Sequence, residues 1–258
     1  MQYDTINVTL ENNIAIITLN RPDVMNALNA QMRAELTNAL HEMGKKARVI
    51  VLTGAGRSFC SGQDLGDRTA ISKIDLERTL RDEYEPMLHA IVNCPLPTIT
   101  ALNGVAAGAG ANLALAADVV IAAKSAYFMQ AFTKIGLIPD AGGTYILPRA
   151  MGMAKAMGAA LFADKITAEQ ADNWGLIWEA VEDAAFSDHW MERAAHLANG
   201  PTIAYSNIKI AFRETWKNTL SQQLEAEARL QKDCGNTRDF QEGVLAFMEK
   251  RPAIFEGR

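Results

Sequence analysis

One acidic residue stands out where an otherwise apolar stretch turns: Asp140, in GLIPDAGGTYILP, residues 136–148. A Pro-Asp-x-Gly-Gly run is ordinary turn chemistry, because proline fixes φ, aspartate bonds to its own backbone and glycine accepts positive φ. Aspartate also caps helices readily. A carboxylate among apolar neighbours can instead act as a general base. The stretch alone favours a turn or helix cap, so a catalytic role needs support from elsewhere in the chain.

Two glycine-rich turns offer that support. GAGRSFCSGQDL (54–65) follows an expected strand, and NGVAAGAGANLA (103–114) leads from a strand into an expected helix. Neither has the GxGxxG pattern with its acidic partner or the GxxxxGKS/T loop, so a nucleotide phosphate site is not indicated. Small residues let a ligand approach the backbone, and N–H groups at a helix start are unpaired donors. Two such turns meeting at one point would form an oxyanion hole, whereas either turn alone could equally serve close helix–sheet packing.

Alternating strands and helices must position these turns. Runs rich in apolar and β-branched residues predict strands at 14–20, 48–54, 98–104, 119–123 and 177–181, and apolar or amphipathic spacing predicts helices at 29–44 and 108–118. Asn29 can cap the first helix and Gly44 can end it. Such strand–helix–strand units predict an α/β core with parallel strands. The polar stretch 66–86 is expected to form a mobile surface loop with a helix.

The second half of the chain is predicted to be mostly helical. Thr167 and Gln170 form a capping box at one helix start. Three amphipathic stretches follow Pro201 with short breaks, so we expect them to pack on a partner subunit or over the core rather than form a separate domain. Their apolar residues are too numerous for a solvent-exposed tail, which predicts an interface. They are Ile208, Ala211, Phe212, Leu220, Leu224, Leu230, Phe240, Leu245 and Phe247.

Composition and charge exclude several classes of protein. The 258 residues are 49% hydrophobic and 21% charged, typical of a globular protein with a substantial core. The net charge of −5 predicts neither a nucleic-acid partner nor a membrane-surface partner. Neither the three cysteines nor the four histidines show metal-ligand spacing, so no metal site is expected. The start, MQYDTINVTLENN, lacks the pattern of a secretory signal, and a cytoplasmic protein is predicted.

Four ordered motifs resemble the crotonase, or enoyl-CoA hydratase/isomerase, superfamily. They are NRPDVMNAL (20–28), GRSFCSGQDL (56–65), NGVAAGAGANLALAADVVIAA (103–123) and FTKIGLIPDAGGTYILPR (132–149). The likeness extends to the ending FMEKRPAIFEGR. It implies an α/β fold in which repeated ββα turns wind into a superhelix, the crotonase-type spiral core. Residues 1–200 would form this core with an acyl-CoA site, and residues 201–258 a C-terminal helical region for assembly into a trimer or a dimer of trimers.

The resemblance also implies which residues form the site. The main-chain N–H groups of Gln63 and Ala109 would hold the thioester oxygen, and Asp140 would be the catalytic carboxylate. Hydratases of the family use two glutamates, but the matching positions here hold Asn112 and Phe132, which cannot activate water. Burial among Phe132, Ile135, Leu137 and Ile138 should raise the pKa of Asp140. Asp64 is the other acid of the motif, and its side chain is expected to play a structural role.

Contacts with the substrate are expected from residues around these groups. They are Met25, Ala27, Gln63, Asp64, Leu65, Gly66, Gly108, Ala109, Asn112 and Phe132. By resemblance, Arg251 and Arg258 are candidates for the phosphate of the CoA ribose, although a place in a solvated tail is the favoured role for either one. Coenzyme A is part of the substrate, and no separate cofactor is implied.

Three functions stay open at this point. The first is an isomerase that acts on an aryl-epoxide thioester in aerobic phenylacetate breakdown. One carboxylate suffices for its double-bond shift, and the motifs most resemble those of family members with this activity. The second is a general enoyl-CoA hydratase or Δ3,Δ2-enoyl-CoA isomerase of fatty acid metabolism. The third is a non-catalytic CoA-binding protein, against which the retained Asp140 and both donor turns argue.

Overall fold

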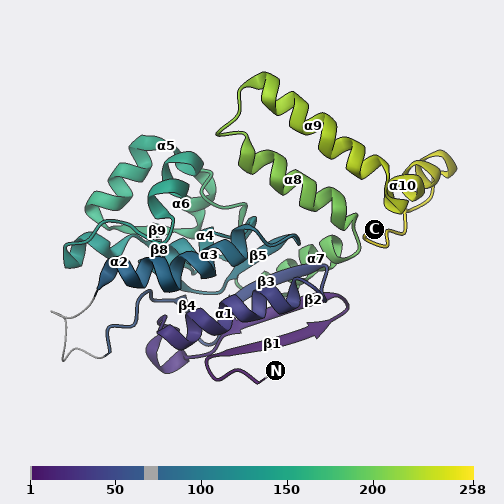
Figure 1. Ribbon diagram of the computed structural model, residues 1–258. Coiled ribbons are helices and arrows are strands. Elements are labelled where there is room, and N and C mark those ends of the chain that lie inside the picture. Colours follow the sequence, from purple (N-terminus) through teal and green to yellow (C-terminus); the bar gives the residue numbers. More distant parts are fainter. Residues whose placement is uncertain (1, 67–74) are drawn as a thin grey trace.

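Two sheets form the core of the protein. The computed structural model describes residues 2–66 and 75–258 (Figure 1). The larger sheet has the strand order β1 (Ile6–Glu11), β2 (Ile14–Leu19), β3 (Val49–Gly54), β5 (Thr98–Leu102), β7 (Val119–Ala123) and β10 (Glu179–Val181). All neighbours in this sheet are parallel except β1 and β2. The predicted strands and their parallel arrangement are therefore confirmed, with the last strand shorter than expected.

The antiparallel pair β1–β2 was not predicted. Its turn residues Asn12 and Asn13 have φ values of 50° and 65°. Two successive positive φ angles are typical of the tightest hairpin turns, where asparagine is favoured. The Asn-Asn pair between two apolar runs is thus the feature of the sequence that indicates this hairpin.

A second, smaller sheet explains the superhelical winding. It has the order β4 (Ser58–Cys60), β6 (Val105–Ala107), β8 (Tyr127–Met129) and β9 (Lys165–Thr167). Strands β3, β5 and β7 each continue into β4, β6 and β8 and then into a helical segment, which gives the predicted ββα repeat. At two of these crossings the chain passes so close to itself that a side chain on Gly54 or Gly104 would collide with the backbone at Ser58 or Arg57.

The first helices of the chain follow the predicted pattern. Helix α1 (Ala30–Met43) is capped by Asn29, whose side chain accepts from the N–H of Met32 at 2.8 Å, and it ends at Gly44. The segment 66–86 was expected to be a loop with a helix, and its described part contains that helix: α2 (Leu76–Thr79), the π-helical turn η3 (Leu80–Tyr84) and α3 (Glu85–Val92) run on without a break. Residues 67–74 lie outside the described part. The helix extends beyond the expected segment, to Val92.

Helices dominate the second half, as predicted. They are α4 (Ala109–Leu115), α5 (Gly143–Phe162), α6 (Ala168–Asn173), α7 (Phe186–Ala198), α8 (Thr202–Glu214), α9 (Leu220–Gly235) and α10 (Arg238–Glu249). The capping box of Thr167 and Gln170 is present at the start of α6. Helices α8 and α9 pack on each other as a pair that projects away from the sheets (Figure 1).

The described residues contain neither a membrane-spanning helix nor a cluster of metal-binding side chains. Among the helices of residues 2–66 and 75–258, none is both long and apolar enough to cross a membrane. Within the same residues, no group of three or more His, Cys, Asp or Glu side chains is arranged to hold a metal ion.

Candidate active site

Both glycine-rich turns and Asp140 line one cavity of about 300 Å³. The cavity is lined by residues 61–65 and 108–109 and by parts of 76–84 and 131–140. The last segment includes the short 3-10 helix η4 (Ala131–Ile135). Residues predicted from three distant motifs are thus brought together by the ββα winding.

The turn that carries Gln63 leaves one N–H group without a protein acceptor. Gln63 pairs with Leu28 in an isolated parallel bridge. The N–H of Leu28 donates to the carbonyl of Gly62 at 2.8 Å, and the N–H of Asp64 donates to the carbonyl of Leu28 at 3.1 Å. Because alternate N–H groups of an extended chain point to opposite sides, that of Gln63 points away from Leu28. In residues 2–66 and 75–258 it has no acceptor.

The second turn supplies another such group. Ala109 is the first residue of α4, so its N–H has no intrahelical acceptor, and none is found elsewhere in the described chain. The two turns lie in contact: a Cβ at Gly62, where φ is 100°, would stand 3.4 Å from the nitrogen of Ala109 and 2.8 Å from the carbonyl oxygen of Ala107. Two unpaired donors therefore lie close together beside the cavity.

The same glycines also serve packing. A side chain on Gly110 would collide with the backbone of Cys60, so helix α4 lies directly against strand β4. Gly108, at φ 53° and ψ −129°, brings the chain into the helix without a capping side chain. Close packing and unpaired donors are consequences of the same approach of the two turns, so the two interpretations of these glycines do not exclude each other.

Asp140 does not cap a helix. Helix α5 starts after Gly142, and its first turn receives no side-chain hydrogen bond. The backbone of Asp140 makes the turn instead, because its carbonyl accepts from the N–H of Gly143 at 2.8 Å. Asp140 lines the cavity, and its Oδ1 atom is buried and has no hydrogen-bond partner in the described residues.

The environment of Asp140 makes it a stronger base than an ordinary aspartate. Burial raises its pKa from 3.8 to about 6, against a smaller opposing effect of its own N–H. Phe132, Ile135 and Leu137 line the cavity with it, as expected. Ile138 does not, since this side chain is 75% exposed, and its expected part in the apolar surround is wrong.

Asn112 lies behind the wall of the cavity and is fully buried. Its Nδ2 donates to the main-chain carbonyl of Asp140 at 2.7 Å, and its Oδ1 accepts from Gln130 at 2.9 Å. Asn112 thus holds the backbone of the residue that carries the buried carboxylate. Gln130 was missed, because no feature of its type or spacing marks a buried partner of Asn112.

Asp64, the other acid at this cavity, has the opposite environment. Its Oδ2 pairs with Arg21 at 2.7 Å, and its Oδ1 accepts from the N–H of Gly66 at 2.9 Å. Burial raises the pKa of Asp64, but these hydrogen bonds outweigh that effect and lower it. Asp64 caps none of the helices in the described part of the chain, and its bonds stabilise the loop that carries Gln63.

The loop at residues 25–27, whose main chain is expected to contact CoA, lies beside the turn that carries Gln63. The carbonyl of Met25 accepts from the N–H of Ser61 at 3.0 Å, and that of Ala27 accepts from Arg21 at 2.6 Å. Leu65 is half exposed at the mouth of the cavity. Residues 25–27 and 63–66 therefore form adjacent edges of one surface.

Both expected phosphate-binding cations are already paired. Arg251 bonds to Glu242 at 2.6 and 2.9 Å and to Glu249 at 2.6 Å, and hydrogen bonds from Arg251 lower the pKa of Glu242 to about 2. Arg258 pairs with Glu256 at 2.7 Å. Within one chain Arg251 ties the start of the C-terminal tail to α10, whereas Arg258 pairs within the tail itself.

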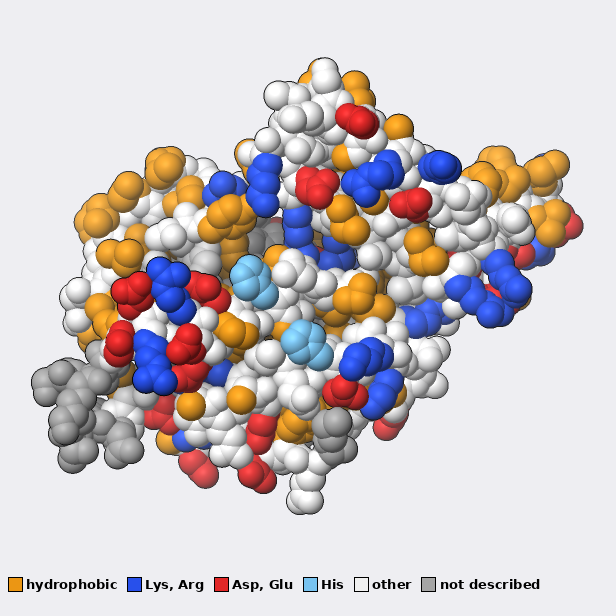
Figure 2. All heavy atoms as spheres, viewed as in Figure 1, with side chains coloured by type: hydrophobic (Ala, Val, Ile, Leu, Met, Phe, Trp, Pro, Cys, Tyr) orange, Lys and Arg blue, Asp and Glu red, His pale blue; other side chains and the backbone are white. Residues whose placement is uncertain are grey.

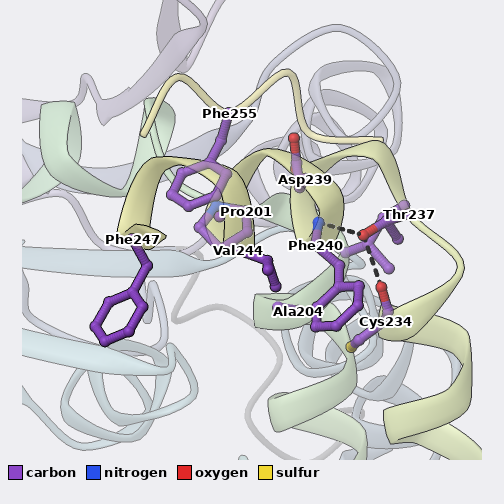
Figure 3. Close-up of a pocket in the computed structure, with 11 residues that line it drawn as sticks. Pro201, Ala204, Cys234, Thr237, Asp239, Phe240, Val244, Phe247 and Phe255 are labelled. Atoms are coloured by element: carbon purple, nitrogen blue, oxygen red, sulfur yellow. Dashed lines mark hydrogen bonds between the residues drawn. The ribbon is translucent and has the colours of Figure 1, made fainter. Parts of the chain in front are cut away.

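A second cavity, of about 360 Å³, lies among the C-terminal helices (Figure 3). Phe240, Val244 and Phe255 surround it, and Thr237 is tied into the turn before α10 by bonds to Phe240 and Cys234. The carboxylate of Asp239 is used by the N–H groups of Glu256 and Gly257, at 2.7 and 2.9 Å. Because the carboxylate of Asp239 is bound in this way, we expect this cavity to serve packing rather than acid–base chemistry.

Comparisons with known proteins point to one family. The sequence model of the enoyl-CoA hydratase/isomerase family matches residues 9–258. A Rhodobacter capsulatus protein described as a probable enoyl-CoA hydratase is 63% identical over 100% of both chains. The 1,2-epoxyphenylacetyl-CoA isomerase of Escherichia coli is 45% identical over 96% of this chain and 97% of its own length. A crystal structure of an enoyl-CoA hydratase from Polaromonas sp. JS666 superposes with a TM-score of 0.92 at 31% identity, covering 97% of this chain and 99% of that one.

Proposed function

Because the chain belongs to the enoyl-CoA hydratase/isomerase family, the crotonase superfamily, we propose that it isomerises an acyl-CoA thioester through an enolate. The thioester oxygen lies between the N–H groups of Gln63 and Ala109. Negative charge grows on this oxygen as the α-proton leaves, and a fixed donor of this kind contributes roughly 2.7–4 kcal/mol to transition-state stability. Two such donors make removal of the α-proton accessible.

Asp140 moves the proton. Its carboxylate takes a proton from the α-carbon of a β,γ-unsaturated thioester, and the electron pair spreads over the dienolate to the thioester oxygen. The carboxylic acid then returns the same proton to the γ-carbon, which yields the α,β-unsaturated thioester. A pKa of about 6 suits both steps, because the group is largely ionised near neutral pH yet basic enough to accept the proton.

One observation carries the choice of isomerisation over hydration. In the part of the cavity that the structure describes, the acids are Asp140, whose Oδ1 has no hydrogen-bond partner, and Asp64, which is bound to Arg21. At the positions of the two hydratase glutamates stand Asn112, which holds the backbone of Asp140, and Phe132. One free carboxylate can shuttle a proton but cannot both activate water and protonate carbon.

The proposed substrate is 2-(1,2-epoxy-1,2-dihydrophenyl)acetyl-CoA, converted to the oxepin thioester. Support comes from the 45% identity to the isomerase of that name and from the apolar wall of the cavity. Ring expansion needs binding and stabilisation of the thioester oxygen, whereas the accompanying β,γ to α,β shift needs Asp140.

A second candidate is a general enoyl-CoA hydratase. The observation in its favour is the 63% identity to the probable enoyl-CoA hydratase. It requires another group to supply the acid–base chemistry that Asn112 and Phe132 lack. The third candidate, a non-catalytic CoA-binding protein, leaves the unpaired carboxylate of Asp140 without a role.

A panel of three thioesters separates these functions. Crotonyl-CoA reports hydration, a 3-enoyl-CoA reports the double-bond shift, and the aryl epoxide reports ring expansion, each followed by mass and ultraviolet spectrum. We expect conversion of the last two and very slow hydration of the first. Hydration with kcat on the order of 10³ s⁻¹ would establish the hydratase, and conversion of none would establish the binding protein.

A further inference from the structure

Tyr84 brings a buried hydroxyl group to the cavity that the proposed reaction does not use. It ends the π-helical turn η3, is only 3% exposed and lines the same cavity as Asp140. Its hydroxyl donates to the side-chain carbonyl of Gln63. A tyrosine placed against a substrate cavity presents a directional donor to whatever enters there.

The Gln63 oxygen that accepts from Tyr84 also accepts from a second donor. Nη1 of Arg33 donates to the same Gln63 oxygen at 3.0 Å. Arg33 is itself held firmly, because it donates to the carbonyl of Leu28 at 2.7 Å, pairs with Glu83 and lies 4.7 Å from the ring centre of Tyr84. When the hydroxyl hydrogen of Tyr84 turns toward another acceptor, the Gln63 carbonyl keeps a hydrogen bond. The rotation therefore leaves no buried acceptor unpaired, which would otherwise cost about 1–3 kcal/mol.

The hydroxyl remains a neutral donor rather than a base. Burial raises the pKa of Tyr84 well above its usual value, the charge of Arg33 lowers it to a smaller extent, and the charge of Asp140 raises it. Among these effects burial is the largest, so the proton stays on the oxygen at physiological pH.

We propose that the Tyr84 hydroxyl is a specificity-determining donor that recognises an oxygen atom on the acyl group, close to its reacting carbons. The ligand class is an acyl-CoA whose acyl part carries an ether, epoxide or hydroxyl oxygen. This inference rests on the proposed function, because it assumes that the acyl group enters the cavity beside Asp140. It separates oxygen-bearing acyl groups from hydrocarbon chains of equal size.

Equilibrium binding of two stable thioesters tests the proposal without turnover. Phenylacetyl-CoA and 2-hydroxyphenylacetyl-CoA differ by one oxygen, and calorimetry gives the ratio of their Kd values. The wild type should prefer the hydroxylated thioester by about tenfold, the effect of one hydrogen bond. Tyr84→Phe should bring the ratio close to one. The matched control is Tyr127→Phe, which removes a hydroxyl from β8 outside the cavity lining and should keep the wild-type ratio.

Gln63→Leu separates recognition from simple support of the loop. It removes the competing acceptor and keeps the hydroxyl, so the preference should be retained or increased. If Tyr84 serves only to hold Gln63, both variants will weaken the two thioesters equally and the proposal is overturned. A wild-type ratio near one overturns it as well.

The ratio of Kd values can be measured whether or not the protein turns over any thioester. If the wild type isomerises none of the thioesters in the panel, the proposed function fails, while the Kd ratios still decide the role of Tyr84. If the wild type isomerises them and Tyr84→Phe keeps the tenfold preference, only the inference about Tyr84 fails.

Discussion

At the scale of single residues, two aspartates at one cavity differ because their partners differ. Asp64 is bound by Arg21 and the N–H of Gly66, which together lower its pKa. Asp140 has one buried oxygen without a partner, and burial raises its pKa to about 6. Environments that move two pKa values apart are typical of sites in which one acid is structural and the other acts as a base.

Asp140→Asn should lower the rate of the double-bond shift by about 100- to 10,000-fold, since it removes the proton carrier and keeps the shape. Substrate affinity should change little. The rate with a 3-enoyl-CoA and the Kd for a saturated acyl-CoA measure the two effects. Asp164→Asn, a change of an exposed aspartate after α5, is the matched control. Isomerisation by Asp140→Asn at the wild-type rate would contradict the assignment.

The pH dependence of the reaction follows from the same pKa. Because the base must be ionised, kcat/KM for the double-bond shift should rise with pH and reach half its plateau near pH 6. A profile that is flat from about pH 5 to 8 would place the pKa of Asp140 near its ordinary value instead.

The contribution of Asp140 to stability should fall as pH rises, whereas kcat/KM rises. The pKa of Asp140 is raised on folding, so its contribution to the free energy of unfolding is greatest below 3.8 and is lost as pH rises through about 6. Asp140→Asn should therefore have a higher Tm than the wild type at pH 8 and lose this advantage near pH 4. Differential scanning calorimetry at the two pH values measures it.

At the scale of elements, a buried ion pair fixes α8 to the core. Lys209, on α8, lies 2.7 Å from Asp118, which precedes β7. It also donates to the carbonyl of Leu96. Asp118 accepts in addition from Thr98 and from Arg213, the latter at 2.6 Å. The side chain of Lys209 is only 9% exposed, so its ion pair with Asp118 is largely shielded from solvent.

Lys209→Met should reduce the free energy of unfolding by about 3 kcal/mol, because removing one partner of a buried pair leaves the other charge desolvated. This is the lower end of the usual range, since Arg213 remains. Arg213→Met, at a side chain that is 32% exposed, should cost about 1 kcal/mol or less. Urea denaturation measures both. Equal losses would show that α8 is held by its apolar contacts rather than by Lys209.

At the scale of the whole molecule, the chain exposes more apolar surface than the core requires. Most of the C-terminal residues expected at an interface are exposed, including Phe212 at 72%, Leu220 at 76% and Phe247 at 85%, while Leu230 packs inward. A second exposed set lies on α5: Met153, Met157, Leu161 and Phe162. Figure 2 shows hydrophobic side chains gathered over α5 and over α10. Patches of this kind usually mark an interface.

We predict that the full chain is a trimer or a dimer of trimers at micromolar concentration. A variant that ends at Pro201 should be poorly soluble or monomeric, and inactive, because it loses the helices that carry most of the exposed apolar residues. Light scattering coupled to size exclusion, together with the 3-enoyl-CoA assay, measures both properties. Monomeric full-length protein with full activity would contradict the prediction.

The sequence by itself determined the regular elements and the nature of the chemistry. Strands β2, β3, β5 and β7 and the predicted helices could be found because each spans enough residues for its apolar period to show. The motifs around Gln63, Ala109 and Asp140 carried the family, which the match over residues 9–258 bears out.

Only the tertiary structure decided how these residues act. The strands of the second sheet have three residues each, too few for a period, so the superhelix was implied by resemblance alone. The free carboxylate of Asp140, the place of Asn112 behind it and the hydroxyl of Tyr84 at the cavity depend on neighbours 21 to 28 positions away along the chain. Burial and hydrogen bonds set the pKa of a side chain, and both come from residues that only the winding of the chain brings together.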